Sequence, residues 1–567
     1  MKNRLLFVWA VLCFVLTPQI SLAAKDEPEE QSLADIINEV NQSLEISKKG
    51  NLDNKPERME WLQDNGFGMF MHWGLDAQLG SVISHMLVGA SDDMVKRYTE
   101  ELPKTFNPKQ WDPEFYVMLA KTCGMKYVAL TAKHHSGFCL WDTQTTDFNV
   151  MNTPYGKDIV REFVDACHKY DMPVGLYYSP EDFLYAYKHG ELIKRRPHRP
   201  DPDSDPEYVK FVQAQVSELM KNYGKIDIFF IDGSGKKTAK NVVWTLQPDC
   251  LITRGAIQSP EQTVPGIPPK GAWESCITLG AQWQYKPQQL DNLKSGSRVI
   301  EILIETRAKG GSLLLNIGPR PDGSMNELHE DIVREVALWN FVNREAMFNT
   351  RPWIVTNEDK IWFTKNKDED TVYAILTRQG QWSMSDRCDF VIRSVKATEG
   401  TEISVLGHNG KVVEYTGMTP EQVEPRFEQK DDGLHISVIR GLRYTNDDKW
   451  ENPVVVKLTH VKPSCQPPQV VNGKASGKNG LVTFRGDLKD LGDAKTVKVG
   501  FEYRVYPGFV ENMYSDKWES TKLVEVSKTG PFVMTVKVPS DKTYQWRAVV
   551  EHPKVKLTGD NSRVNLR

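Results

Sequence analysis

Apolar runs that end abruptly in polar or aromatic residues recur along the first half of the chain. In the clearest example, residues 126–141, a Tyr-Val-Ala-Leu segment leads within a few residues into the pair His134-His135. Continuous apolar strands indicate burial on both faces, as in parallel α/β sheets, and the carboxyl ends of such strands form the ligand site. The same pattern recurs in residues 67–74, 173–180, 226–233, 250–255 and 271–276.

Helical patterns with recognisable ends lie between these runs. One helix is predicted to begin at Asp112, its N-cap, and to end at Gly124. Residues 157–171 have an amphipathic pattern. Strands that alternate with helices predict an α/β fold, a (β/α)8-like barrel over residues 58–348. A doubly wound open sheet is the alternative. Seven strands are evident in the pattern, and the eighth is assumed.

The helical period stops after residue 348, and all-β patterns follow. Residues 349–461 contain short strand-like runs with turn residues between them, which predicts a β-sandwich. The Pro-rich segment 462–470 indicates a linker. Residues 471–567 predict a second β domain, similar to fibronectin type III or immunoglobulin-like folds. We expect this domain to be a spacer rather than a sugar-binding module.

The N-terminus has the pattern of an export signal. Lys2 and Arg4 precede an apolar stretch, and small residues surround Ala23. We therefore expect residues 1–23 to be a cleaved signal peptide and the protein to be exported, periplasmic or secreted in a bacterium. Residues 24–57 form a polar leader. No later run of about 20 apolar residues occurs, so we expect no membrane span.

Charge and cysteine usage narrow the functional classes. The chain of 567 residues has 71 basic and 75 acidic side chains and a net charge of -4, which gives no electrostatic reason to expect a nucleic acid partner. One of the eight cysteines, Cys13, lies in the expected signal. The odd number that remains falls mostly within apolar patterns, which favours buried thiols over disulfides. Nothing in the sequence specifies the oligomeric state.

Asp232 is the first candidate for chemistry. It directly follows an apolar strand that ends in Phe229, Phe230 and Ile231, and Gly233 then turns the chain. One interpretation is an N-cap for the following helix. The other is a nucleophile or general base held rigidly at a barrel mouth.

The pair His134-His135 allows three interpretations: hydrogen bonding to a polyol, structural histidines, or a metal site. Adjacent residues on an extended strand point to opposite sides, so the two cannot easily chelate one ion. Polyol binding is favoured, and no metal or other cofactor is expected. Aromatic residues near the same strand ends suit the apolar faces of sugars, with packing of the barrel core as the alternative. They are Trp73, Trp141, Tyr177, Tyr178, Trp273 and Trp283.

Six motifs in this order resemble the α-L-fucosidases of glycoside hydrolase family 29. They are Gly68-Met-Phe-Met-His-Trp-Gly74, Lys126-Tyr-Val-Ala-Leu-Thr-Ala-Lys-His-His135, Gly175-Leu-Tyr-Tyr-Ser179, Phe230-Ile-Asp-Gly233, Trp273-Glu-Ser-Cys276 and Gly310-Gly-Ser-Leu-Leu-Leu-Asn-Ile-Gly-Pro319. The resemblance spans about residues 58–355 and continues loosely through the following β-sandwich.

The resemblance implies a retaining exo-α-L-fucosidase that acts on fucosylated oligosaccharides or glycoconjugates with two carboxylates and no metal. Asp232 then matches the nucleophile, and Glu274 is the best match to the acid/base, with Glu261 as the alternative. The residues expected to bind the sugar are His72, Trp73, His134, His135, Tyr177, Phe230, Arg254 and Trp283.

The chain departs from the family pattern at the walls of the expected pocket. Ser136 stands where the family usually has aspartate, Phe230 where it usually has tryptophan, and residues 80–86 replace a Glu-Trp pair. Two other functions therefore stay open. One is an α-L-galactosidase of the same family, because an apolar pocket discriminates weakly against one added hydroxyl. The other is a non-catalytic glycan-binding protein.

Overall fold

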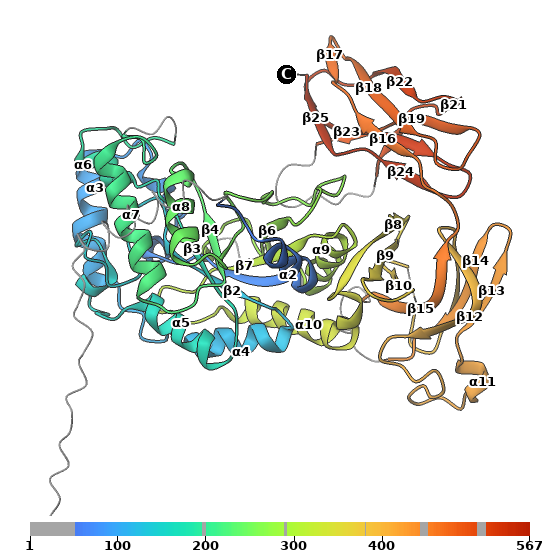
Figure 1. Ribbon diagram of the computed structural model, residues 1–567, viewed down its shortest axis with the longest axis horizontal. Coiled ribbons are helices and arrows are strands. Elements are labelled where there is room, and N and C mark those ends of the chain that lie inside the picture. Colours follow the sequence, from blue (N-terminus) through green and yellow to red (C-terminus); the bar gives the residue numbers. More distant parts are fainter. Residues whose placement is uncertain are drawn as a thin grey trace, which may run out of the picture.

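The computed structural model shows a barrel followed by two β domains (Figure 1). The expected signal peptide and most of the polar leader lie outside the described residues. None of the described helices is long and apolar enough to cross a membrane. The described residues are 52–195, 200–287, 292–379, 382–442, 452–506 and 517–566.

A curled parallel sheet forms the centre of the barrel, with strand order β5-β4-β3-β2-β1-β7-β6. Every residue of these strands is buried, as the continuous apolar runs predict. The strands are β1 (Phe67–Met71), β2 (Val128–Lys133), β3 (Val174–Tyr178), β4 (Ile228–Ile231), β5 (Leu251–Ile252), β6 (Glu274–Thr278) and β7 (Ser312–Ile317).

The described residues contain no regular eighth strand between β5 and β6. Segment 254–262 takes its place and forms isolated parallel bridges to β6, at Gln258 with Trp273 and at Glu261 with Cys276. The backbone N–H groups of Glu274 and Cys276 donate to this segment. The barrel is therefore closed on this side by an irregular segment, where the sequence pattern led us to assume a strand.

Because side chains alternate along each strand, those that point into the barrel lie at successive heights between its floor and its mouth. On β6, residues Glu274, Cys276 and Thr278 share one face, and Thr278 lies in register with Asn316 of β7. Helix α2 (Pro56–Asn65) closes the bottom of the barrel, where Leu62 packs with Tyr127. The carboxyl ends of the strands thus form the open mouth, and their first residues form the floor.

Helices cover the outside of the sheet (Figure 1). Asp112 caps one of them by accepting from the Phe115 N–H, and Gly124 ends it with φ of 82°, as predicted. The α-helices of the barrel region after α2 are α3 (Asp92–Lys96), α4 (Pro113–Cys123), α5 (Ile159–Lys169), α6 (Phe183–Lys188), α7 (Pro206–Lys221), α8 (Lys236–Leu246), α9 (Gly296–Ala308) and α10 (Glu327–Asn343).

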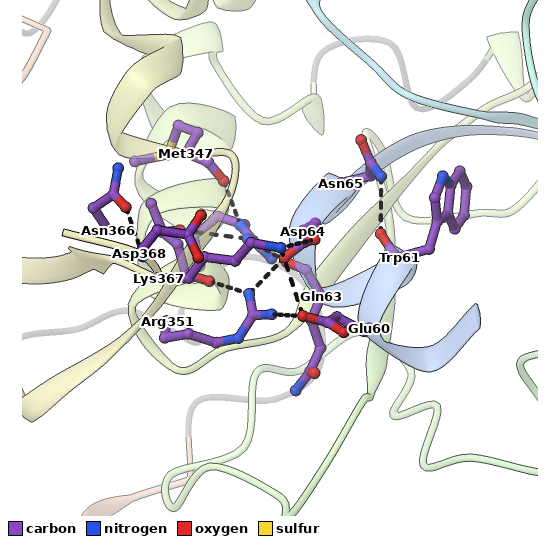
Figure 2. Close-up of polar contacts among 12 residues, drawn as sticks. Glu60, Trp61, Gln63, Asp64, Asn65, Met347, Arg351, Asn366, Lys367 and Asp368 are labelled. Carbon is purple, nitrogen blue, oxygen red and sulfur yellow. Dashed lines mark hydrogen bonds and ion pairs between the residues drawn. The ribbon is translucent and has the colours of Figure 1, made fainter. Parts of the chain in front are cut away.

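An ion-pair network joins α2 to the first β domain (Figure 2). Asp64 accepts from Arg351 at 2.7 Å and from Lys367 at 2.6 Å, and Glu60 lies 3.4 Å from Arg351. Burial alone would raise the pKa of Asp64, but the hydrogen bonds from Lys367 and Arg351 outweigh it and hold the pKa below its usual value. The helix that closes the barrel floor is thereby tied to the β-sandwich.

The first β domain consists of two antiparallel sheets, β12-β15-β10-β9-β8 and β11-β14-β13. Their inward side chains share one core, which includes Trp353 and Trp382. The elements are β8 (Thr350–Glu358), β9 (Ile361–Asn366), β10 (Thr371–Leu376), β11 (Arg387–Ile392), β12 (Val395–Val405), α11 (Pro420–Val423), β13 (Arg426–Lys430), β14 (Gly433–Ile439) and β15 (Val454–Pro463).

The C-terminal β domain also has two sheets, around β18 and around β19 and β23, with Phe484 and Trp546 in its core. It begins at β16, and residues 464–468 connect it to β15. The strands are β16 (Gln469–Asn472), β17 (Ser476–Lys478), β18 (Leu481–Asp490), β19 (Val497–Val505), β20 (Glu519–Ser520), β21 (Val524–Val526), β22 (Gly530–Lys537), β23 (Thr543–Glu551), β24 (Lys556–Thr558) and β25 (Ser562–Asn565).

The cysteines of the described residues are all free thiols, which confirms the prediction from their apolar surroundings. Six are buried, and Cys388 is half-buried. Burial raises the pKa of the Cys123 and Cys167 thiols well above their usual value, so both are protonated and unreactive at neutral pH.

Candidate active site

The mouth of the barrel brings together polar residues from five neighbouring strand ends. His72 follows β1, the histidine pair follows β2, Tyr177 lies in β3, Asp232 follows β4 and Arg254 follows β5. Parallel strands deliver their carboxyl ends to one edge, so a cluster that is scattered over 180 residues of sequence forms a single site.

Asp232 is held at the centre of this cluster by two hydrogen bonds, with an imidazole nearby. Tyr177 Oη donates to Asp232 Oδ2 at 3.0 Å, and Arg254 Nη1 donates to Oδ1 at 2.9 Å. His135 Nε2 lies 3.7 Å from Oδ2. Burial alone would raise the pKa of Asp232, but the nearby His135, Arg254 and His134 hold it well below its usual range. Asp232 is therefore ionised and oriented, as a nucleophile requires.

The N-cap alternative for Asp232 is wrong. Helix α8 starts at Lys236, and Gly235 occupies its N-cap position with no side-chain cap. The Asp232 carboxylate contacts Tyr177 and Arg254 instead.

Arg254 links Asp232 to a second carboxylate. Its Nη1 atom, which contacts Asp232, also forms an ion pair with Glu261 Oε1, and its Nη2 atom donates to the Ser259 carbonyl at 3.0 Å. Because both carboxylates contact the same nitrogen, their nearest oxygens lie at most about 6 Å apart, two hydrogen-bond lengths. Glu261 is 42% exposed and Asp232 23%, so both are accessible from the mouth.

Glu274 lies in a different part of the barrel. It is the first residue of β6, and Thr278, four residues later, reaches the level of Asn316 at the mouth. At about 3.3 Å per residue, Glu274 is roughly 13 Å below that level. It is fully buried and accepts from Tyr127 Oη at 2.6 Å. Burial raises its pKa to about 7, partly offset by the Tyr127 hydrogen bond.

The prediction that Glu274 is the acid/base does not fit this position. A general acid must reach the leaving oxygen beside the nucleophile. Glu274 instead points into the interior above α2, where Tyr127 also contacts Ser312 Oγ at 2.7 Å. The alternative residue, Glu261, is the carboxylate that the structure brings together with Asp232.

The three histidines of the mouth are oriented through their Nδ1 atoms. His72 contacts Asn316 Oδ1 at 2.6 Å, and His134 contacts Ser84 Oγ at 2.9 Å. His135 contacts Ser179 Oγ at 2.6 Å, and Ser179 donates to the Glu181 carbonyl. Burial lowers the pKa of His72 to about 3 and also lowers that of His134, so both are neutral hydrogen-bonding groups near pH 7.

The expectation that His134 and His135 point to opposite sides is wrong. Strand β2 ends at Lys133, so the alternation of a strand no longer applies, and the two rings lie 4.3 Å apart. One nitrogen from each ring and an oxygen of Asp232 lie within 4.8 Å of one another, a spacing at which a metal ion could bind. Arg254 offsets the charge of Asp232, which weakens the attraction of this cluster for a cation.

The aromatic candidates divide between the site and its surroundings. Trp283 lies at the mouth, 4.8 Å from the His72 ring. Phe230 is 2% exposed and supports the site from below, 5.5 Å from the Tyr177 ring and 5.1 Å from the Arg254 guanidinium carbon. Trp73 is not at the site: its ring lies in the core beside Phe106. It packs 4.9 Å from Trp111 and donates to the Arg320 carbonyl.

Sequence reasoning missed three residues of the site: His85, Ser84 and Asn316. The His85 ring lies 5.6 Å from that of His135. Ser84 Oγ also accepts from the Ser136 N–H at 2.8 Å and so joins its loop to the end of β2. Asn316 could have been found as the polar residue near the end of β7. Residues 80–86 were placed at the pocket wall by the family resemblance, but they have no periodic pattern that would single out His85.

The comparisons with known proteins identify the family of the chain. The family model for α-L-fucosidase matches residues 36–345, more than half of the chain. An α-L-fucosidase of Branchiostoma floridae is 28% identical over 406 residues, 63% of this chain and 86% of that protein. The solved α-L-fucosidase isoenzyme 1 of Paenibacillus thiaminolyticus is 26% identical with a TM-score of 0.56, over 71% of this chain and 98% of that one.

A third protein, the Bacteroides thetaiotaomicron GH29 α-L-fucosidase solved as a trapped covalent intermediate, shares the fold. It is 23% identical, with a TM-score of 0.54 over 73% of this chain and 98% of that one. The barrel with its following β domain, the mouth cluster around Asp232 and the family match lead to one conclusion. The chain belongs to the α-L-fucosidase family.

Proposed function

We propose that the protein is a retaining exo-α-L-fucosidase in which Asp232 is the nucleophile and Glu261 the acid/base. The observation that supports these roles is the shared contact of both carboxylates with Arg254 Nη1. A separation of at most about 6 Å fits the roughly 5 to 5.5 Å of retaining glycosidases and is shorter than the roughly 6.5 to 9.5 Å of inverting ones.

In the first step, Asp232 attacks the anomeric carbon while Glu261 donates a proton to the departing glycosidic oxygen. The C–O bond to the leaving group breaks, and an ester forms between the sugar and Asp232. In the second step, Glu261 takes a proton from a water molecule, which attacks the same carbon and releases Asp232. Two inversions give net retention of configuration.

The other mouth residues have binding and orienting roles in this proposal. Tyr177 and Arg254 fix the Asp232 carboxylate before reaction, which lowers the cost of reorganisation during attack. The neutral imidazoles of His72 and His134 suit sugar hydroxyls, because each offers a donor or an acceptor without requiring a counter-charge. Phe230 and Phe70, with rings 5.1 Å apart, form the apolar base beneath them.

The proposed substrate is a terminal α-L-fucose on an oligosaccharide or glycoconjugate. Export to the periplasm or the medium, proposed from the N-terminal sequence pattern, would give the enzyme access to such glycans. The test is hydrolysis of 4-nitrophenyl α-L-fucoside compared with 4-nitrophenyl α-L-galactoside, with the product configuration followed by NMR. Release of β-L-fucose as the first product would contradict retention, and preference for the galactoside would change the sugar assigned to the site.

A further inference from the structure

His85 is a half-buried imidazole at the mouth that the mechanism above does not use. Its ring lies 5.6 Å from the His135 ring and 6.1 Å from the His134 ring. The Nδ1 atom is buried and has no hydrogen-bond partner. A buried polar atom without a partner costs about 1 to 3 kcal/mol, and a hydrogen bond to a bound ligand would offset this cost.

Burial keeps His85 neutral. Burial is the largest cause and lowers its pKa to about 4, with His135 and Arg195 acting in the same direction. Asp232 and Glu181 oppose them without reversing the shift. A neutral imidazole offers one donor and one acceptor, which suits a hydroxyl group rather than an anion.

The position of His85 indicates which part of the sugar it faces. In the sheet, β2 and β3 lie on one side of β4, and β5 lies on the other. The His85 ring contacts the histidines at the end of β2, whereas Glu261 pairs with Arg254 after β5. The leaving oxygen must be next to Glu261, so His85 faces the edge of the fucose ring that is remote from the leaving group.

The loop that carries His85 is fixed to the site. Ser84, the preceding residue, is fully buried with φ of 58°, and its Oγ atom contacts both His134 Nδ1 and the Ser136 N–H. A non-glycine residue in this backbone region costs free energy that the surrounding contacts must offset. On the other side of the loop, the Gly89 N–H donates to the Ile193 carbonyl at 3.0 Å. The imidazole is thus held in place before the sugar binds.

We infer that His85 is a glycone-specificity residue, hydrogen-bonded to the C3 or C4 hydroxyl of the bound L-fucose. This inference rests on the proposed function, since it assigns a contact within the same site. It adds a recognition element from the loop after β1 to the strand-end residues already described.

The test combines His85→Phe, which keeps an aromatic ring without nitrogens, with substrates that lack one hydroxyl. On 4-nitrophenyl α-L-fucoside, we expect kcat/KM of the variant to fall about 10- to 100-fold, the effect of one hydrogen bond to a buried partner. Either the 3-deoxy or the 4-deoxy substrate should reduce wild-type kcat/KM by a similar factor. On that same substrate, His85→Phe should cause almost no further loss.

His85→Gln restores a hydrogen-bonding group and should recover part of the loss, which separates hydrogen bonding from packing. His435→Phe, at an imidazole of β14 in the β-sandwich, is the matched control and should behave as the wild type. Unchanged kcat/KM for His85→Phe on the fucoside, or additive losses on both deoxy substrates, would overturn the inference.

A direct binding measurement separates this inference from the proposed function. Titration calorimetry of wild type and His85→Phe with L-fucose and its 3-deoxy and 4-deoxy analogues reports the contact without turnover. If the wild type fails to hydrolyse any α-L-fucoside, the proposed function fails, while a loss of L-fucose affinity in His85→Phe that disappears for one deoxy sugar still supports the contact. Equal affinities of both proteins for L-fucose would contradict it.

Discussion

Replacing Glu261 with alanine should affect substrates according to their leaving group. A general acid contributes about 10² to 10⁴ in rate, or roughly 3 to 5 kcal/mol of transition-state stabilisation. A sugar hydroxyl is a poor leaving group and needs the full contribution, so hydrolysis of a fucosylated disaccharide should fall by this factor. A nitrophenolate departs without a proton, so formation of the covalent intermediate from 4-nitrophenyl α-L-fucoside should slow much less.

The Glu261→Ala variant should also lose the second role of Glu261, which is to activate water in the second step. Without Glu261 no carboxylate activates the water, so the ester with Asp232 should accumulate and give a burst of nitrophenol in stopped-flow absorbance. Azide needs no general base and should accelerate turnover of the variant, releasing fucosyl azide of retained configuration. The ion pair with Arg254 also disappears, and Gln at position 261, which cannot take a proton from water, should show the same burst.

Glu274→Gln is the control that separates the two glutamates. At roughly 13 Å below the mouth, Glu274 cannot touch the leaving oxygen, so kcat/KM of this variant should stay close to wild type for both leaving groups. If Glu274→Gln or Glu274→Ala instead shows the leaving-group asymmetry and Glu261→Ala does not, the positional argument is refuted.

Five further outcomes are expected. Asp232→Gly should lose turnover, and azide should restore some rate and yield fucosyl azide of inverted configuration; near-normal activity of this variant would rule out the nucleophile assignment. EDTA should leave the fucosidase rate unchanged, and His134→Ala should lose about 1 to 3 kcal/mol of transition-state stabilisation; a rate lost in chelator and restored by a divalent cation would show a metal requirement. Above pH 7, Glu274→Gln should be more stable than the wild type in urea unfolding. Burial raises the folded-state pKa of Glu274 to about 7, so wild-type stability falls as pH rises from about 4.3, while glutamine has no proton to lose. Asp64→Asn should lower stability by about 1 to 3 kcal/mol at pH 7. Its lowered pKa stabilises the fold above about pH 3.9, and that contribution is lost as the pH falls through the folded-state pKa, so the difference from wild type should vanish in acid.

The strand ends account for what the sequence predicted well. Asp232, His134 and Tyr177 were found because each stands where a buried apolar run stops, and parallel strands bring such positions together. The all-β domains followed from short strands with frequent turns. These features depend on local periodicity, which a single sequence displays.

The sequence-based predictions fail where the role of a residue depends on its position along a strand or on the course of a loop. Glu274 was chosen by a motif, but it begins β6 rather than ending it, and the mouth of that strand is at Thr278. Trp73 follows His72 directly, but its ring packs against Phe106 and Trp111 rather than at the mouth. His85 and Glu261 lie on loops whose course is set by tertiary contacts such as those of Ser84 and Arg254, so no periodicity identified their places.

The two proposed catalytic carboxylates lie on backbone segments that differ in their tolerance to insertions, because the barrel is closed irregularly beside Glu261. Asp232 extends from a regular strand with a parallel neighbour on each side, so an insertion there would shift a whole register. Glu261 lies on segment 254–262, which contacts β6 through isolated bridges and single hydrogen bonds rather than through a regular ladder. Insertions and substitutions just after Glu261 can therefore reshape the space for the leaving group while the nucleophile stays in place. For anyone redesigning the enzyme to transfer fucose to new acceptors, residues 263–272 are the part of the chain to randomise first.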